Sequence, residues 1–125
     1  MGHVFVEAEL SWAGAEIVRF LADTGATYTV IPESVGKRLE LAVSPRPMSV
    51  TLADGSSRAM HFSTVLMKLA GREAGVTVLL APDGAEPLLG VEALEALGLS
   101  VDPTSHRIEA TRAHGVLAVG IRPNR

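Results

Sequence analysis

The chain has 125 residues, of which 47% are hydrophobic and 20% charged, and its formal net charge is −3. This length favours a single domain over residues 1–125, and the apolar content suffices for a core. A negative balance without a basic cluster argues against nucleic acid and against an anionic membrane surface as partners. The absence of cysteine excludes disulfides and thiolate metal sites, and it fits a reducing compartment.

The N-terminal residues lack the basic region and the long apolar core of a signal peptide. No window reaches the roughly 18 charge-free apolar residues that a spanning helix needs. We therefore expect a cytoplasmic protein that does not enter a membrane. The four histidines, which show no metal-ligand spacing, are His3, His61, His106 and His114. We therefore expect no metal, and we expect no other cofactor either.

The first elements in the chain are predicted to form a hairpin. Apolar alternation over residues 4–10 and 15–21 predicts two strands around a turn at 11–14. A β-branched strand follows at 29–31. Residues 32–39 are predicted to form a short helix, because proline stands at its start, an acidic residue follows in its first turn and basic residues lie near its end.

A second hairpin is predicted from strands at 48–52 and 58–69, with Asp54-Gly55 as the turn signal. The imperfect period of the second strand predicts a bend or bulge near Ser63-Thr64. Residues 70–75 predict a turn, and 76–81 a buried strand.

The last third contains an apolar pair with glycine, Leu88-Leu89-Gly90, and a predicted helix at 91–97 that Gly98 ends. Further strands are predicted at 99–103, 106–111 and 116–121. Short strands between turn residues predict an all-β fold, a small closed or partly closed barrel with one clear helix in the C-terminal half.

One acid stands out, because Asp23 lies between two apolar, strand-like runs. Such flanks predict burial, which is costly for a carboxylate unless it is paired or hydrogen-bonded. Thr24 supplies a hydroxyl, and Gly25 allows close approach or positive φ. A surface Asp-x-Gly turn is the alternative for the tripeptide alone.

The run Asp-Thr-Gly-Ala at 23–26, followed by Thr-Val-Ile-Pro at 29–32, resembles the active-site loop of aspartic proteases. It is most similar to the retroviral-type (retropepsin-like) family and its bacterial single-domain branch. The hairpin around Gly55 resembles the flap of that family, and Leu88-Leu89-Gly90 resembles the segment that passes beneath the active-site loop. The order of these motifs matches over most of the chain.

The resemblance implies an acid-protease-type barrel that is one half of a homodimeric aspartic endopeptidase acting on extended peptide or protein substrates. It makes Asp23 the catalytic acid/base. Supporting roles fall to the loop residues Thr24, Gly25 and Ala26, to the flap residues Ala53, Asp54, Gly55 and Ser56, and to the floor residues Leu88, Leu89 and Gly90.

The chain contains one Asp-Thr-Gly, whereas the chemistry needs two carboxylates that share a proton around one water. The second carboxylate is therefore expected from a copy of the chain, on a two-fold axis. One departure concerns Thr27 and Val91, which stand where viral members carry an acid and an arginine that pair. The alternatives are a non-catalytic peptide-binding or dimerisation module on the same barrel, and a β barrel in which Asp23 only caps a turn.

Overall fold

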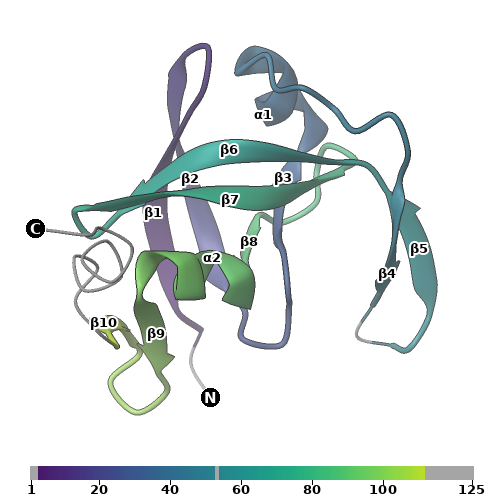
Figure 1. The fold of residues 1–125 in the computed structure, drawn as a ribbon. Coiled ribbons are helices and arrows are strands. Elements are labelled where there is room, and N and C mark those ends of the chain that lie inside the picture. Colours follow the sequence, from purple (N-terminus) through teal and green to yellow (C-terminus); the bar gives the residue numbers. More distant parts are fainter. Residues whose placement is uncertain (1–2, 53, 112–125) are drawn as a thin grey trace, which may run out of the picture.

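In the computed structural model, residues 3–52 and 54–111 are described, and within them six strands close a barrel in the order β1-β2-β8-β3-β7-β6 (Figure 1). These strands are β1 (Phe5–Ser11), β2 (Ala15–Ala22), β3 (Thr29–Pro32), β6 (Phe62–Leu69), β7 (Arg72–Ala81) and β8 (Leu88–Leu89). The predicted barrel is confirmed.

Two hairpins form separate two-stranded sheets outside the barrel. One pairs β4 (Met48–Thr51) with β5 (Ser57–Met60), and the other pairs β9 (Leu99–Asp102) with β10 (Arg107–Ala110). The strand predicted at 116–121 lies outside the described residues.

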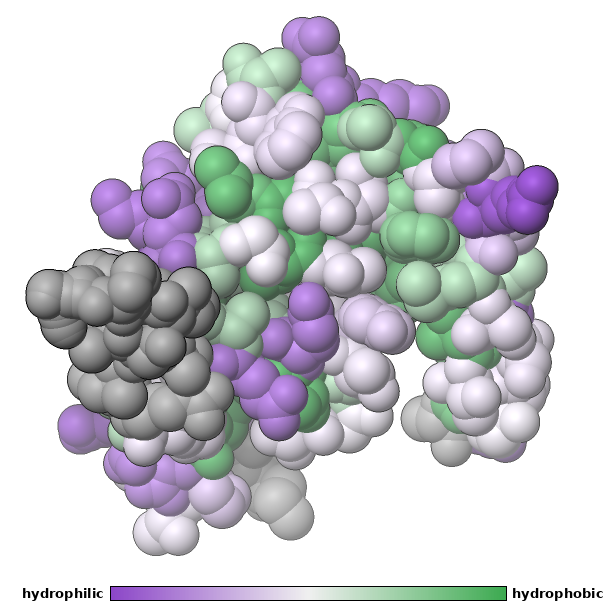
Figure 2. Space-filling view, viewed as in Figure 1, coloured by the Kyte–Doolittle hydropathy of each residue, from purple (hydrophilic) through white to green (hydrophobic). Residues whose placement is uncertain are grey.

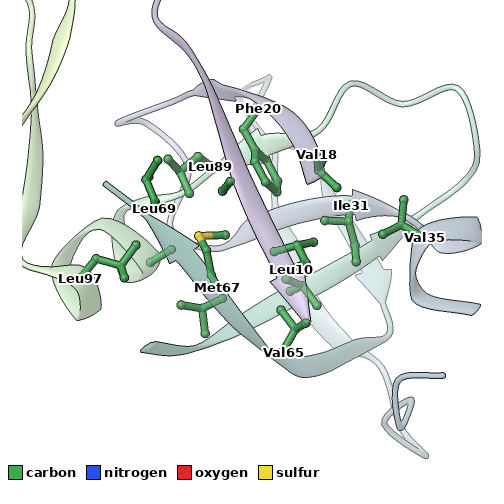
Figure 3. Packing of buried hydrophobic residues seen from close by; sticks show 14 of the residues in the cluster. Leu10, Val18, Phe20, Ile31, Val35, Val65, Met67, Leu69, Leu89 and Leu97 are labelled. Atoms are coloured by element: carbon green, nitrogen blue, oxygen red, sulfur yellow. The ribbon is translucent and has the colours of Figure 1, made fainter. Parts of the chain in front are cut away.

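The barrel interior is filled by the alternate side chains of its strands. In β6, Val65 and Met67 are fully buried while Leu66 and Lys68 face outward. The large buried side chains point toward one another from opposite walls (Figure 3), among them Leu10, Phe20, Ile31, Met67 and Leu89. Burying each such side chain stabilises the fold by about 1.5–3 kcal/mol.

The bend predicted near Ser63-Thr64 is wrong in position, because β5 and β6 are separated at His61. Phe62 faces a second apolar cluster outside the barrel, whereas the buried Ser63 belongs to the opposite face of β6. The imperfect period therefore reflects one segment whose two faces serve different clusters. The second apolar cluster consists of Tyr28, Val30, Met48, Val50, Met60, Phe62, Leu79, Ala81 and Ala85.

The turn predicted at 70–75 is also too long, since β7 already begins at Arg72. Ala70 and Gly71 both have positive φ, 55° and 75°, which is the geometry of a tight hairpin turn. Alanine rarely adopts such a φ, so the sequence indicates a turn here but not that it is confined to Ala70 and Gly71.

Both predicted helices are present, as α1 (Glu33–Arg38) and α2 (Val91–Leu97). Helix α1 is held from outside: the Ser34 N–H donates to Asp83 Oδ1 at 3.0 Å, and Arg38 pairs with Glu16 at 2.7 Å. Gly98 ends α2 in the left-handed conformation, with φ 70°. No helix within the described ranges is long and apolar enough to span a membrane.

Candidate active site

The loop after β2 is a tight turn that its own polar atoms stabilise. The N–H of Ala26 donates to the carbonyl of Asp23 at 3.0 Å, and the N–H of Gly25 donates to Asp23 Oδ1 at 2.9 Å. A Cβ atom on Gly25 would lie 3.2 Å from that same oxygen. Glycine therefore lets the carboxylate fold back over the turn without crowding.

The loop is open on one side. Asp23 is half-buried, and Thr24 and Gly25 are exposed, so the burial predicted for this carboxylate is wrong for the single chain. The apolar alternation of β2 ends at Ala22, and the turn then leaves the end of the barrel. The carboxylate of Asp23 thus stays partly exposed in one chain, on a hydrogen-bonded turn.

The segment Leu88-Leu89-Gly90 runs beneath this loop. Strand β8 pairs in parallel with β2, with Ala22 opposite Leu89, and it pairs antiparallel with β3. The N–H of Asp23 donates to the carbonyl of Leu89 at 2.9 Å. Because Leu89 itself is fully buried in the core, this bond ties Asp23 to the barrel interior.

The chain crossing at Gly90 is closely packed. A Cβ atom there would lie 2.5 Å from the carbonyl carbon of Tyr28 and 2.8 Å from the carbonyl oxygen of Thr27. The N–H of Gly90 donates at 3.1 Å to Oγ1 of Thr29, a fully buried side chain. Sequence reasoning missed Thr29, although a threonine on the inward face of a strand is the signal that could have found it.

Helix α2 begins directly against the loop. The N–H of Val91 donates to the carbonyl of Ala26 at 2.8 Å, and the N–H of Glu92 donates to that of Thr27 at 2.9 Å. Main-chain hydrogen bonds therefore join the loop to the helix at Thr27 and Val91, the two positions where the resemblance to viral members implied an ion pair that this chain lacks.

The β4–β5 hairpin, predicted as the flap, has an ordered turn near its tip. The N–H of Gly55, with φ 87°, donates to the carbonyl of Leu52 at 2.9 Å. Asp54 Oδ1 accepts from the hydroxyl and the N–H of Ser56, at 2.6 and 2.9 Å. These bonds lower the pKa of Asp54 from its ordinary value, the hydroxyl most strongly. Ala53, also predicted in the flap, lies outside the described residues.

The base of the hairpin is held by Ser44. Its N–H donates to the carbonyl of Phe62 at 2.8 Å, and its Oγ accepts from the Phe62 N–H at 3.1 Å. The Ser44 carbonyl lies 2.9 Å from Nδ1 of His61. The base of the hairpin is therefore joined to β6 and the residue before it by hydrogen bonds of Ser44.

The hairpin and the loop at 23–28 extend from the same end of the molecule (Figure 1). A hollow separates the hairpin from the body of the protein (Figure 2). The second apolar cluster includes Met48 and Val50 of the hairpin as well as Tyr28, at the end of the loop, and Val30 of β3. The structure thus brings the predicted roof and the Asp23 loop to one end of the barrel.

A groove of about 580 Å³ adjoins the loop next to α2. We call it the α2–β9 groove, and it is lined by Thr24, Val91, Leu94, Glu95, Leu99, Ser100, Val101 and Thr111. Within the described part of the chain, no group of three or more histidine, aspartate or glutamate side chains could hold a metal ion.

The barrel, the Asp-Thr-Gly loop and the strand threaded beneath it define an acid-protease-type fold. A family model described as aspartyl protease matches residues 8–93, so the chain belongs to the aspartyl protease family. The fold resembles that of the EIAV protease in complex with the inhibitor HBY-793, with a TM-score of 0.64 and 20% identity over 81% of this chain and 93% of that one. The expected retroviral-type fold is confirmed. No curated protein matches the sequence.

Proposed function

We propose that this protein is an aspartic endopeptidase in which residues 1–125 form one domain and two copies build one active site. The observation that carries the proposal is the way Asp23 is held. Its N–H donates to the carbonyl of Leu89, its carboxylate accepts from the N–H of Gly25, and its side chain is partly exposed to solvent. Membership of the aspartyl protease family supports the class of chemistry. A two-fold axis beside the loop would bring the second Asp23 to the first.

Two adjacent carboxylates cannot both ionise easily, so the pair would share one proton. The ionised Asp23 would take a proton from a water held between the two, and the oxygen of that water would attack the carbonyl carbon of the scissile bond. The protonated Asp23 of the other copy would give its proton to the carbonyl oxygen. Collapse of the tetrahedral intermediate, with proton transfer to the nitrogen, would release the two peptides.

The neighbouring residues take roles that fit their positions. Thr24, whose side chain is exposed, would brace the loop across the dimer, and the exposed main chain of Gly25 would contact substrate. Ala26 would support the turn. An extended substrate would bind by strand addition between the flap residues Ala53, Asp54, Gly55 and Ser56 and the Asp23 loop. The floor residues Leu88, Leu89 and Gly90 would support that loop from beneath.

The α2–β9 groove is proposed to face the partner copy. Thr24 lines the groove and follows Asp23 directly. If the two Asp23 side chains meet on the axis, the surface beside Thr24 must approach the same axis.

The test is cleavage of an unstructured protein such as casein from acidic to neutral pH, with and without pepstatin. Asp23→Asn keeps an oxygen for the Gly25 N–H, so the fold should persist while cleavage falls by at least about 10²-fold, since positioned acid–base groups contribute 10²–10⁴-fold. Glu73→Gln, on an exposed carboxylate of β7, is the control. Equal behaviour of wild type and Asp23→Asn would favour the non-catalytic module.

A further inference from the structure

Strand β7 has a main-chain donor that lies beyond its ladder with β3. The β3–β7 pairing begins with Thr29 opposite Val78, so Thr77 precedes it. The N–H of Thr77 instead donates to Oε1 of Glu92 at 3.2 Å in a part-buried setting. A partly buried N–H requires an acceptor, and the carboxylate of Glu92 supplies it from another element.

Glu92 also contacts the active-site loop through its main chain. Its N–H donates to the carbonyl of Thr27, and the preceding N–H, of Val91, donates to that of Ala26. The N–H of Ala26 in turn donates to the carbonyl of Asp23. One residue therefore binds the barrel wall with its side chain and the Asp23 turn with its backbone.

The far end of α2 is held by the same strand. Arg72 Nη1, at the start of β7, donates to the carbonyls of Leu97 and Gly98 at 3.0 and 3.3 Å. Helix α2 has seven residues, fewer than a helix needs to be stable alone in water. Its position therefore depends on contacts with its neighbours, and β7 provides one at each end.

We propose that Glu92 is a positioning residue for Asp23. Its carboxylate fixes the first turn of α2 to β7, and the N–H groups of that turn hold the Ala26 and Thr27 carbonyls. With Thr27 and Val91 unable to form an ion pair, this link stabilises the loop in another way. The kinetic consequence rests on the proposed protease function, whereas the structural link does not.

The structural link is tested by amide hydrogen exchange on the full chain, with Glu92→Ala, Glu92→Gln and the control Glu73→Ala. Alanine is at least as good a helix former as glutamate, so propensity does not weaken α2. We expect the exchange protection of Thr77 and Val91 to fall at least tenfold in Glu92→Ala, with the β1–β2 amides unchanged. Glu92→Gln keeps an acceptor oxygen and should retain protection. Unchanged protection in Glu92→Ala would overturn the inference.

The positioning role is tested by casein cleavage with the same variants. A displacement of about 1 Å at a catalytic group can cost 10²-fold in rate, so Glu92→Ala should lower kcat at least tenfold with little change in KM. Glu92→Gln should recover most of it. Lost protection with an unchanged kcat, or a change in KM alone, would refute the role. If the wild type cleaves nothing, the proposed function fails, and the exchange measurement still tests the link.

Discussion

A Cβ atom on Gly90 would lie 2.5 Å from the carbonyl carbon of Tyr28. No real Cβ approaches that closely, and the neighbour is main chain, which cannot rotate away as a side chain can. The residue after Leu89 is thus limited to glycine by the main chain of Thr27 and Tyr28, at the end of the Asp23 loop.

Gly90→Ala should therefore force the two chain segments apart. Overpacking of this kind typically costs about 1–3 kcal/mol, and the shift should also disturb Asp23 through Leu89. Urea unfolding measures the first effect and casein cleavage the second. Gly14→Ala is the matched control, because no atom lies within 4 Å of a Cβ there. Equal stability of the two variants would contradict the crossing as described.

The buried hydroxyl of Thr29 gives a second prediction. Thr29→Val keeps the shape but leaves the Gly90 N–H without its acceptor, a loss that costs about 1–3 kcal/mol in a buried setting. Thr29→Ser keeps the oxygen and should restore most of the hydrogen-bonding contribution. The unfolding free energies of the wild type, Thr29→Val and Thr29→Ser test this prediction. A valine variant as stable as wild type would mean that the bond contributes nothing.

Much of this site follows from local sequence. The apolar flanks of Asp23 predict strands on both sides of the loop, and Pro32 predicts where the second strand gives way to a helix. The resemblance of Leu88-Leu89-Gly90 to a family segment implies its position beneath the loop. The features that could not be predicted depend on contacts between residues far apart in the sequence. Whether Asp23 is buried depends on where the barrel ends, and the contact of Glu92 with Thr77 joins elements that no periodicity relates.

The flap turn should depend on pH through Asp54. The hydroxyl of Ser56, and to a smaller extent its N–H, hydrogen-bond to the carboxylate of Asp54 and lower the pKa of Asp54 from its ordinary value of 3.8. The bonds therefore stabilise the turn fully above pH 3.8, and this stabilisation is lost as the pH falls through the lower folded value. Carboxyl NMR titration should show a midpoint below 3.8 that rises in Ser56→Ala. Ser57→Ala, at an exposed neighbour, should leave it unchanged.

If the α2–β9 groove faces a partner copy, as proposed, a substitution in the groove should weaken self-association. Ser100→Arg adds a long charged side chain in the groove without removing apolar packing, so it should weaken self-association at least about tenfold. Thr64→Arg adds the same side chain to the exposed face of β6 and should not. Sedimentation equilibrium measures both. A wild-type dimer that Ser100→Arg leaves intact would exclude this groove as the contact while leaving the two-carboxylate chemistry in place.

The separate sheet of β4 and β5 has a consequence for how a substrate would reach the proposed site. The two strands pair with each other and not with the barrel strands, and Ser44 joins their base to His61 and Phe62. A movement of the hairpin as a unit would therefore break no hydrogen bond of the barrel sheet. The apolar contacts that hold the hairpin to the barrel lie in the second apolar cluster, where Met48 and Val50 pack against the buried Met60, Leu79 and Ala81. A smaller side chain at Met48 or Val50 should therefore loosen the hairpin and leave the barrel core unchanged.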